Sequence, residues 1–164
     1  MDQTAITQYI SDTFDGVAIV VGSRDAGSPE IAWGDTFFIY DPGRQFPPAG
    51  QFPFATIVTK DYGAFDRASQ LDRAGVFRLN IGVTKETYCA LFGAQPSYPP
   101  EGHAVETGHD FAVLDQLLPH PVYASMSWVC VLNPSVATFR TVQPLLAEAY
   151  QLAVTRYAKR EARR

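Results

Sequence analysis

Four consecutive apolar residues at positions 129–132 constrain the fold more than any other segment of the sequence. A short, fully apolar run that is closed by an Asn-Pro dipeptide is typical of a β-strand buried on both faces and followed by the start of a helix. His120, Tyr123 and Trp128 precede this run. The sequence therefore predicts a central strand with a cluster of polar and aromatic side chains beside it.

Hydrophobic periodicity predicts an α-helix at each end of the chain. Over residues 3–14 the apolar residues recur at spacings of three and four, and Asp2 or Thr4 can cap the helix. At the other end, Pro144 can be accommodated only near the start of a helix. We therefore expect the main C-terminal helix over residues 142–159, after a short separate turn.

Two further helices are expected inside the chain. The first, within residues 84–93, has clear boundaries, because Thr84 is a natural N-cap and Gly93 stands where a C-terminal glycine belongs. The second is a short helix that Asp110 can cap and that ends at Pro119.

β-Branched and aromatic residues, either in dense runs or alternating with polar ones, predict the strands. These segments are residues 17–21, 31–40 (a hairpin, or one strand with a turn), 54–59, 76–81 and 129–132. Hairpin-like spacing with helices at both ends predicts an α+β fold. We expect a single domain over residues 1–164, with a largely antiparallel sheet of four or five strands covered on one face by the N- and C-terminal helices. Irregular loops are expected over 41–53 and 94–107, and a solvated basic tail over 159–164.

The composition excludes several classes of protein. With 17 acidic and 13 basic residues the chain carries a net charge of -4, so a nucleic-acid partner is not expected. Cys89 and Cys130 are too few for a disulfide framework and have apolar neighbours, which indicates small buried residues in a reducing compartment. No run of about eighteen apolar residues and no signal-peptide pattern is present, so we expect a cytoplasmic location without a membrane partner.

Two histidines, His109 and His120, are the candidate proton-transfer groups. An imidazole can act as acid or base near neutral pH, and a neighbouring carboxylate, here Asp110 or Asp115, orients it. The candidate catalytic residues are His109, His120, Asp110 and Tyr123, facing a pocket walled by Trp128 and Phe111. In the alternative interpretation, Asp110 is a helix cap, His109 is exposed before it, and His120 is held in a Pro-His-Pro turn for structural reasons.

Arg78 and Asn80 are the candidate ligand-binding residues outside this cluster. They alternate with apolar residues and share the polar side of a predicted strand. Such side chains are ordinarily solvated. If their face instead lines the pocket, Arg78 can hold a ligand carboxylate or phosphate in a bidentate grip.

The sequence predicts neither a metal site nor a cofactor. His103, His109, His120 and Asp110 can supply metal ligands, but their spacing fits no metal signature. A phosphate loop, a dinucleotide fingerprint and a serine-hydrolase elbow are all absent. Cys130 lies within a buried strand and is therefore not expected to act as a nucleophile.

Three segments carry a resemblance to a known family. VFRLNIGVTKETYCALFG (76–93), TGHDFAVLDQLLPHPVYASMSWVCVLNPS (107–135) and PLLAEAYQLAV (144–154) resemble, over most of the chain, the bacterial domain-of-unknown-function 6194 family. That family implies no activity.

A more distant resemblance is to the YjbR/MmcQ (CyaY-like) group of small α+β proteins. Trp128 and the Ala-Tyr-Gln-Leu stretch at 149–152 match its Trp-bearing last strand and its closing helix. That resemblance implies a nucleic-acid or protein interaction module without catalysis.

Two functional hypotheses follow. The first is a cytoplasmic small-molecule pocket protein that binds a small organic molecule, in the form of a cofactor-independent acid–base enzyme if it is catalytic. The second is the YjbR-like interaction module. A homodimer formed through the terminal helix, with Tyr150 and Tyr157 at its seam, is a further expectation.

Overall fold

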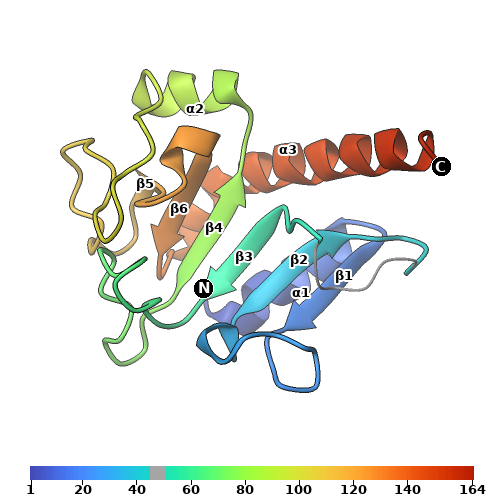
Figure 1. The fold of residues 1–164 in the computed structure, drawn as a ribbon, viewed down its shortest axis with the longest axis horizontal. Coiled ribbons are helices and arrows are strands. Elements are labelled where there is room, and N and C mark those ends of the chain that lie inside the picture. The colour runs from blue at the N-terminus through green and yellow to red at the C-terminus, as the bar shows by residue number, and fades with distance from the viewer. Residues whose placement is uncertain (45–50) are drawn as a thin grey trace.

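The computed structural model describes residues 1–44 and 51–164, which form an α+β fold around one open antiparallel sheet (Figure 1). The described residues contain six strands, in the spatial order β1-β2-β3-β4-β6-β5. Their bounds are β1 Val17–Val21, β2 Thr36–Tyr40, β3 Ala55–Val58, β4 Arg78–Gly82, β5 Leu117–Pro119 and β6 Trp128–Leu132. Every neighbouring pair is antiparallel. The prediction of an α+β fold with an antiparallel sheet is confirmed.

The expected count of four or five strands was wrong by one edge strand in the described chain. β5 forms where a short helix capped by Asp110 had been predicted. The Asp110 carboxylate instead accepts from the amide of Ala112 and closes a turn, and Asp115 adopts a left-handed backbone conformation with φ 58° that a helix does not allow. Leu118 is then buried beside Cys130 of β6, and Pro119 is tolerated because β5 is an edge strand.

The described helices are α1 Gln3–Thr13, α2 Lys85–Phe92 and α3 Val136–Glu161, with short 3-10 turns at Glu30–Ala32 and Ala124–Met126. Asp2 caps α1, since its carboxylate accepts from the Ala5 amide at 2.8 Å. The predicted helix within residues 84–93 is confirmed as α2, with Thr84 as its N-cap.

Pro144 does not divide the C-terminal helix, so the expected separate turn before residue 142 was wrong. α3 is continuous and contains Pro144. Phe139 and Val142 lie before the proline and are buried against the sheet. Burying two such side chains stabilises by about 1.5–3 kcal/mol each, which offsets the roughly 3 kcal/mol that an internal proline costs.

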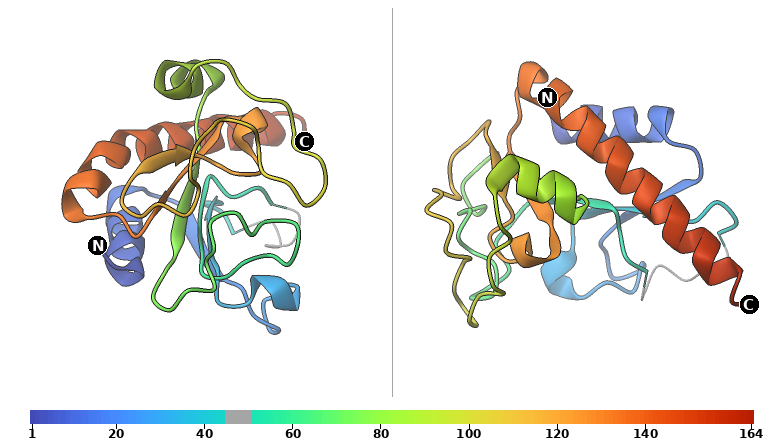
Figure 2. Two further views of the ribbon diagram at one scale, coloured as in Figure 1. Left: turned by 90° about the vertical axis from the view of Figure 1, so that its left-hand side faces the viewer. Right: turned by 90° about the horizontal axis from the view of Figure 1, so that it is seen from above.

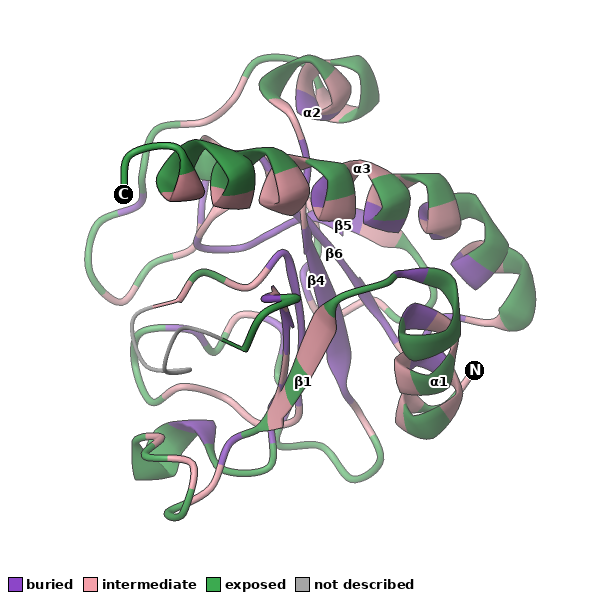
Figure 3. Cartoon of the chain, turned by 90° about the vertical axis from the view of Figure 1, so that its right-hand side faces the viewer, coloured by how far each residue is buried: buried purple, intermediate pink, exposed green. Residues whose placement is uncertain are grey.

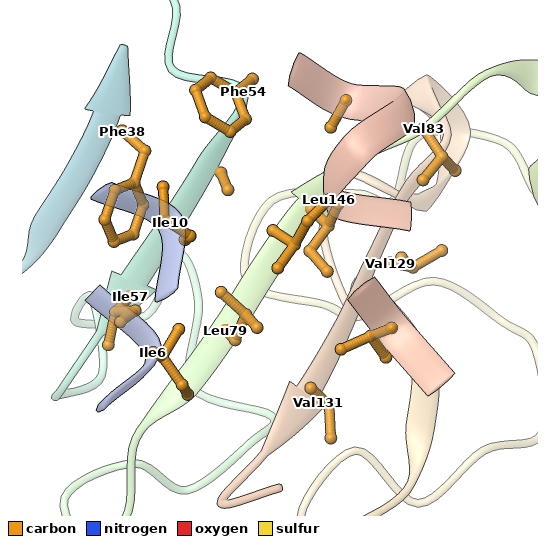
Figure 4. Close-up of a cluster of buried hydrophobic side chains, with 14 of the residues drawn as sticks. Ile6, Ile10, Phe38, Phe54, Ile57, Leu79, Val83, Val129, Val131 and Leu146 are labelled. Carbon is orange, nitrogen blue, oxygen red and sulfur yellow. The ribbon is translucent and has the colours of Figure 1, made fainter. Parts of the chain in front are cut away.

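Helices α1 and α3 cover one face of the sheet (Figure 2). Ile6 and Ile10 of α1 and Leu146 of α3 point toward the apolar side chains of β2, β3, β4 and β6 (Figure 4). The predicted covering of one face by the terminal helices is thus present. The last turns of α3 are mainly exposed (Figure 3). The basic tail at 159–164 begins in the last turn of α3 and continues beyond its end at Glu161.

The opposite face of the sheet is covered by loops rather than helices. Residues 59–77 and 120–127 cross it, and both segments contribute side chains that line the cavity on this face. Of the predicted loop at 41–53, residues 45–50 lie outside the described residues, and the remainder contains no helix or strand. The predicted loop at 94–107 likewise contains no helix or strand.

Candidate functional site

A cavity of about 320 Å³ lies between the loop-covered face of the sheet and the loops that cross it. Because successive strand residues point to opposite faces, alternate residues of β2, β3, β4 and β6 form its floor. The floor residues are Phe37, Thr56, Val58, Arg78, Asn80 and Trp128. The loops supply Tyr62, Phe65, Asp66, His120 and Tyr123 to its walls.

Arg78 is the centre of the cavity floor and has 0% of its surface exposed. Its guanidinium binds the Asp66 carboxylate through both terminal nitrogens, with Nη1–Oδ1 at 3.1 Å and Nη2–Oδ2 at 2.5 Å. Nη1 also donates to Ser69 Oγ at 2.8 Å. The buried cation is therefore neutralised by a bidentate partner, as a charge inside a protein requires.

The same contacts set the protonation of both partners. Burial alone would raise the pKa of Asp66, but the hydrogen bonds and charge of Arg78 outweigh burial and lower that pKa below its ordinary value. For Arg78, burial acts to lower the pKa, and the bonded carboxylate of Asp66 outweighs it and raises the pKa. The pair is thus fully ionised at neutral pH, with no net charge.

A chain of hydrogen bonds extends from Arg78 across the floor. Nε of Arg78 donates to Oδ1 of Asn80 at 2.7 Å, and Nδ2 of Asn80 donates to Oγ1 of Thr56 at 3.0 Å. Arg78 and Asn80, the two residues predicted to share a strand face, therefore do share one, and that face is buried rather than solvated.

His120 lies at the junction of the floor and the wall, with 2% of its surface exposed. Its Nδ1 atom accepts from the backbone amides of Val122 at 3.1 Å and Tyr123 at 2.9 Å. Its Nε2 atom is 3.2 Å from Nη2 of Arg78. Burial, and then the charge of Arg78, lower the pKa of His120 well below 6.5, so the imidazole is neutral at pH 7.

Aromatic side chains form the walls. The Tyr123 ring lies over His120, with a centroid separation of 5.0 Å and a 35° angle between the planes, and Phe65 lies 6.0 Å from Tyr123. The Tyr62 hydroxyl donates to the buried carboxylate of Asp35. Burial, together with that bond, raises the pKa of Tyr62, which stays protonated.

A second cavity of about 480 Å³ adjoins the first along β2 and shares Phe37, Pro53 and Tyr62 with it. The charged and polar groups converge only in the first, among the described residues that line the two cavities. The first cavity is therefore the candidate site.

The structure brings together five of the predicted site residues and leaves three outside, all eight being described. Those that line the cavity are Arg78, Asn80, His120, Tyr123 and Trp128. The ring of His109 instead lies against Phe92 and Phe111, at 5.6 and 6.5 Å, and its Nδ1 atom is 2.8 Å from Thr107 Oγ1. Phe111 belongs to the main core, and Asp110 closes an exposed turn. The expected pairing of His109 with His120 is thus not found, because β5 carries His120 to the sheet and leaves His109 behind.

Asp66, Ser69, Tyr62 and Phe65 are site residues that the sequence pattern did not reveal. They lie in the irregular segment after β3, where no periodicity indicates which side chains turn toward the sheet. One signal was available: an arginine on a strand that becomes buried needs a carboxylate partner, and Asp66 and Asp61 were nearby candidates.

Metal and thiol chemistry find no support within residues 1–44 and 51–164. No group of three or more potential metal-ligating side chains is present in that part of the chain. Cys130 is buried in β6, and burial raises the pKa of its thiol to about 12. Over the same described residues, no helix is both long enough and apolar enough to cross a membrane.

The fold and the cavity define an α+β protein with an open antiparallel sheet, helices on one face and a cavity with a buried arginine on the other. The chain belongs to the DUF6194 family, a family of unknown function whose model matches residues 1–162. No curated protein matches the chain, and no solved structure does. The more distant YjbR-like resemblance stays a prediction without a supporting match.

Proposed function

We propose that this protein binds a small, uncharged organic molecule with a flat apolar body in the cavity over β3, β4 and β6. The observation that carries the proposal is the pairing of an aromatic wall with a buried ionic floor that has no net charge. Cavities of about 300 to 1,000 Å³ with apolar walls and a few convergent polar groups are typical of small-molecule sites.

The charges around the cavity favour an uncharged ligand over an anion. Asp66 already occupies both terminal nitrogens of Arg78. Burial raises the pKa of Tyr62 most, the carboxylates of Asp35 and Asp66 raise it further, and Arg78 opposes them only in part. A ligand carboxylate in the cavity would be repelled by both of these carboxylates and would lose its hydration. The sequence-based hypothesis that Arg78 grips a ligand carboxylate is therefore not carried into this proposal.

The rim of the cavity supports an apolar ligand body. Phe52, Met126 and Phe65 line the cavity and are 83%, 57% and 41% exposed. Large apolar side chains gathered at a cavity mouth gain about 25 cal/mol for each Å² of apolar surface that a ligand removes from water. Trp128 and Tyr123 offer flat faces deeper inside, on which a planar ligand can stack.

Binding is favoured over acid–base catalysis by the contacts of His120. Two backbone amides occupy Nδ1, and the pKa of the ring is lowered well below 6.5, so the imidazole is a weak base at neutral pH. The second histidine that the acid–base hypothesis required lies outside the cavity. We therefore propose a binding protein without proton transfer through His120.

Tryptophan fluorescence tests the proposal, because only one of the two tryptophans lines the cavity. A Trp33→Phe variant leaves Trp128 as the sole reporter, and Trp128→Phe is the matched control. A panel of neutral aromatic compounds, each with an anionic and a cationic analogue, is titrated into both variants. Neutral compounds are expected to change the emission of the first variant only. Anionic members that bind tightest, or a panel in which no neutral member binds, would contradict the proposal.

A further inference from the structure

Three N–H donors point at the two ring nitrogens of His120. The amides of Val122 and Tyr123 point at Nδ1, and Nη2 of Arg78 is 3.2 Å from Nε2. A neutral imidazole has one lone pair and one N–H, and an arginine can only donate. Whichever ring nitrogen carries the proton therefore has its N–H facing the N–H of a donor.

The backbone decides which nitrogen carries the proton. Two amides, both within 3.1 Å, converge on Nδ1, and neither can turn away, because the chain from His120 leads directly into the 3-10 turn at Ala124–Met126. A proton on Nδ1 would make this N–H face two backbone N–H groups, whereas a proton on Nε2 faces only the one N–H of Arg78. The ring proton is therefore on Nε2, and this N–H faces an N–H of Arg78.

We infer that the cavity selects ligands with an uncharged carbonyl oxygen, which accepts a hydrogen bond from Nε2 of His120. The inference rests on the proposed function and names the ligand class for that site. Both residues line the cavity. A carbonyl oxygen can accept from Nε2 at an ordinary hydrogen-bond distance of about 2.7 to 3.2 Å. Nη2 of Arg78 is 3.2 Å from Nε2, so the partial negative charge of that oxygen would lie close to the buried guanidinium.

The neighbouring charge separates a carbonyl from a carboxylate. Nη2 of Arg78, 3.2 Å from Nε2 of His120, bonds Oδ2 of Asp66 at 2.5 Å. A ligand carboxylate bound to Nε2 would therefore bring two anions close together in a buried site. The Tyr123 ring lies over His120, with a centroid separation of 5.0 Å, and so places an aromatic surface beside this donor. The ligand class is therefore an aromatic ketone, amide or lactone.

The tautomer can be tested without any ligand. Nitrogen NMR of protein labelled in its histidines distinguishes a protonated from an unprotonated ring nitrogen, and His103→Gln and His109→Gln variants assign the signals of the three rings. The expected result for His120 is a protonated Nε2 and an unprotonated Nδ1 at pH 7. A protonated Nδ1 would overturn the inference.

Three probes of similar size test the selectivity: acetophenone, ethylbenzene and benzoate. One hydrogen bond to a buried donor corresponds to roughly tenfold in affinity, so acetophenone is expected to bind about tenfold more tightly than either other probe. His120→Leu should reduce the preference for acetophenone over ethylbenzene to about twofold, whereas His109→Gln, outside the cavity, should leave it unchanged. If His120→Leu does not fold, the wild-type comparison decides.

The outcomes separate the two proposals. Equal binding of acetophenone and ethylbenzene overturns the inference about the carbonyl oxygen and leaves the proposed binding of uncharged molecules intact. Tightest binding of benzoate, or no binding of any probe, overturns both.

Discussion

Replacing Asp66 by Asn tests the central physical claim about the cavity floor, which is that one carboxylate compensates a fully buried guanidinium. The variant removes the negative charge and turns an amide N–H₂ toward Arg78, while keeping the size of the side chain. Arg78 has 0% exposure and cannot release its proton. Breaking a buried ion pair from one side costs about 3 to 5 kcal/mol, a large part of the roughly 5 to 15 kcal/mol by which a domain is stable.

Urea unfolding at pH 7 measures this cost, and Asp110→Asn is the matched control. Asp110 undergoes the same change of charge in an exposed turn, where an Asn oxygen can still accept from the Ala112 amide. Its expected effect is within about 0.5 kcal/mol. A loss below about 1 kcal/mol for Asp66→Asn would refute the assignment of Asp66 as the compensating charge.

Lowering the pH should produce the same loss in the unmodified protein. The folded-state pKa of Asp66 lies below its ordinary value of 3.8. Its contribution to the free energy of unfolding is therefore complete above about pH 5 and is lost as the pH falls through the folded-state pKa. The wild type should lose more stability than Asp66→Asn between pH 5 and pH 2. Parallel stability profiles of the two proteins would contradict this linkage.

Three other regions yield predictions. A Cβ atom at Gly82 would lie 3.0 Å from the Trp128 indole, so Gly82→Ala should shift Trp128 emission in the Trp33→Phe background, with an unchanged circular dichroism spectrum; unshifted emission would contradict the contact. Glu148 accepts from the first turn of α2 and from its N-cap, so Glu148→Ala should cost about 0.5 to 2 kcal/mol of stability and speed amide hydrogen exchange in α2; unchanged exchange would show that α2 is held mainly by other contacts. The raised pKa of Cys130 predicts that a thiol reagent at pH 8 modifies only Cys89 in the folded protein and both cysteines in urea; native modification of Cys130 would contradict its burial.

Much of the fold could be predicted because the signals lie within single elements. The caps of α1 and α2 are local hydrogen bonds between residues three or four apart, and residue types reveal them. β5 was missed because its pairing with β6 depends on a turn at Asp115, and the apolar residues before it fit a short helix equally well. The sequence predicted a separate turn before residue 142 because the proline is a local signal, whereas the burial of Phe139 and Val142, which keeps α3 continuous, depends on the tertiary fold.

The site was less predictable, because it depends on where loops cross the sheet. Arg78 and Asn80 were placed on one face by strand alternation, which is local. The partner carboxylate comes from a loop twelve residues away, at Asp66, and nothing in the sequence pattern gives the direction of its side chain. His109 was expected to lie near His120 because the two are close in the sequence. Strand β5 lies between them and carries His120 to the sheet, so the two rings are separated.

The Arg78–Asp66 pair places two charges in the buried floor of the cavity, and their presence there needs a physical reason. The pair ties the loop after β3 to β4, but well-packed apolar residues of similar volume can do the same at no cost in stability. Stability alone therefore does not account for a buried arginine. An apolar replacement would, however, remove the N–H of Nη2 that faces His120. The double variant Arg78→Met with Asp66→Leu should thus fold with a stability within about 2 kcal/mol of wild type and still bind ethylbenzene, while its preference for acetophenone falls. A double variant that folds and keeps the full preference would show that the arginine serves the scaffold and not the ligand.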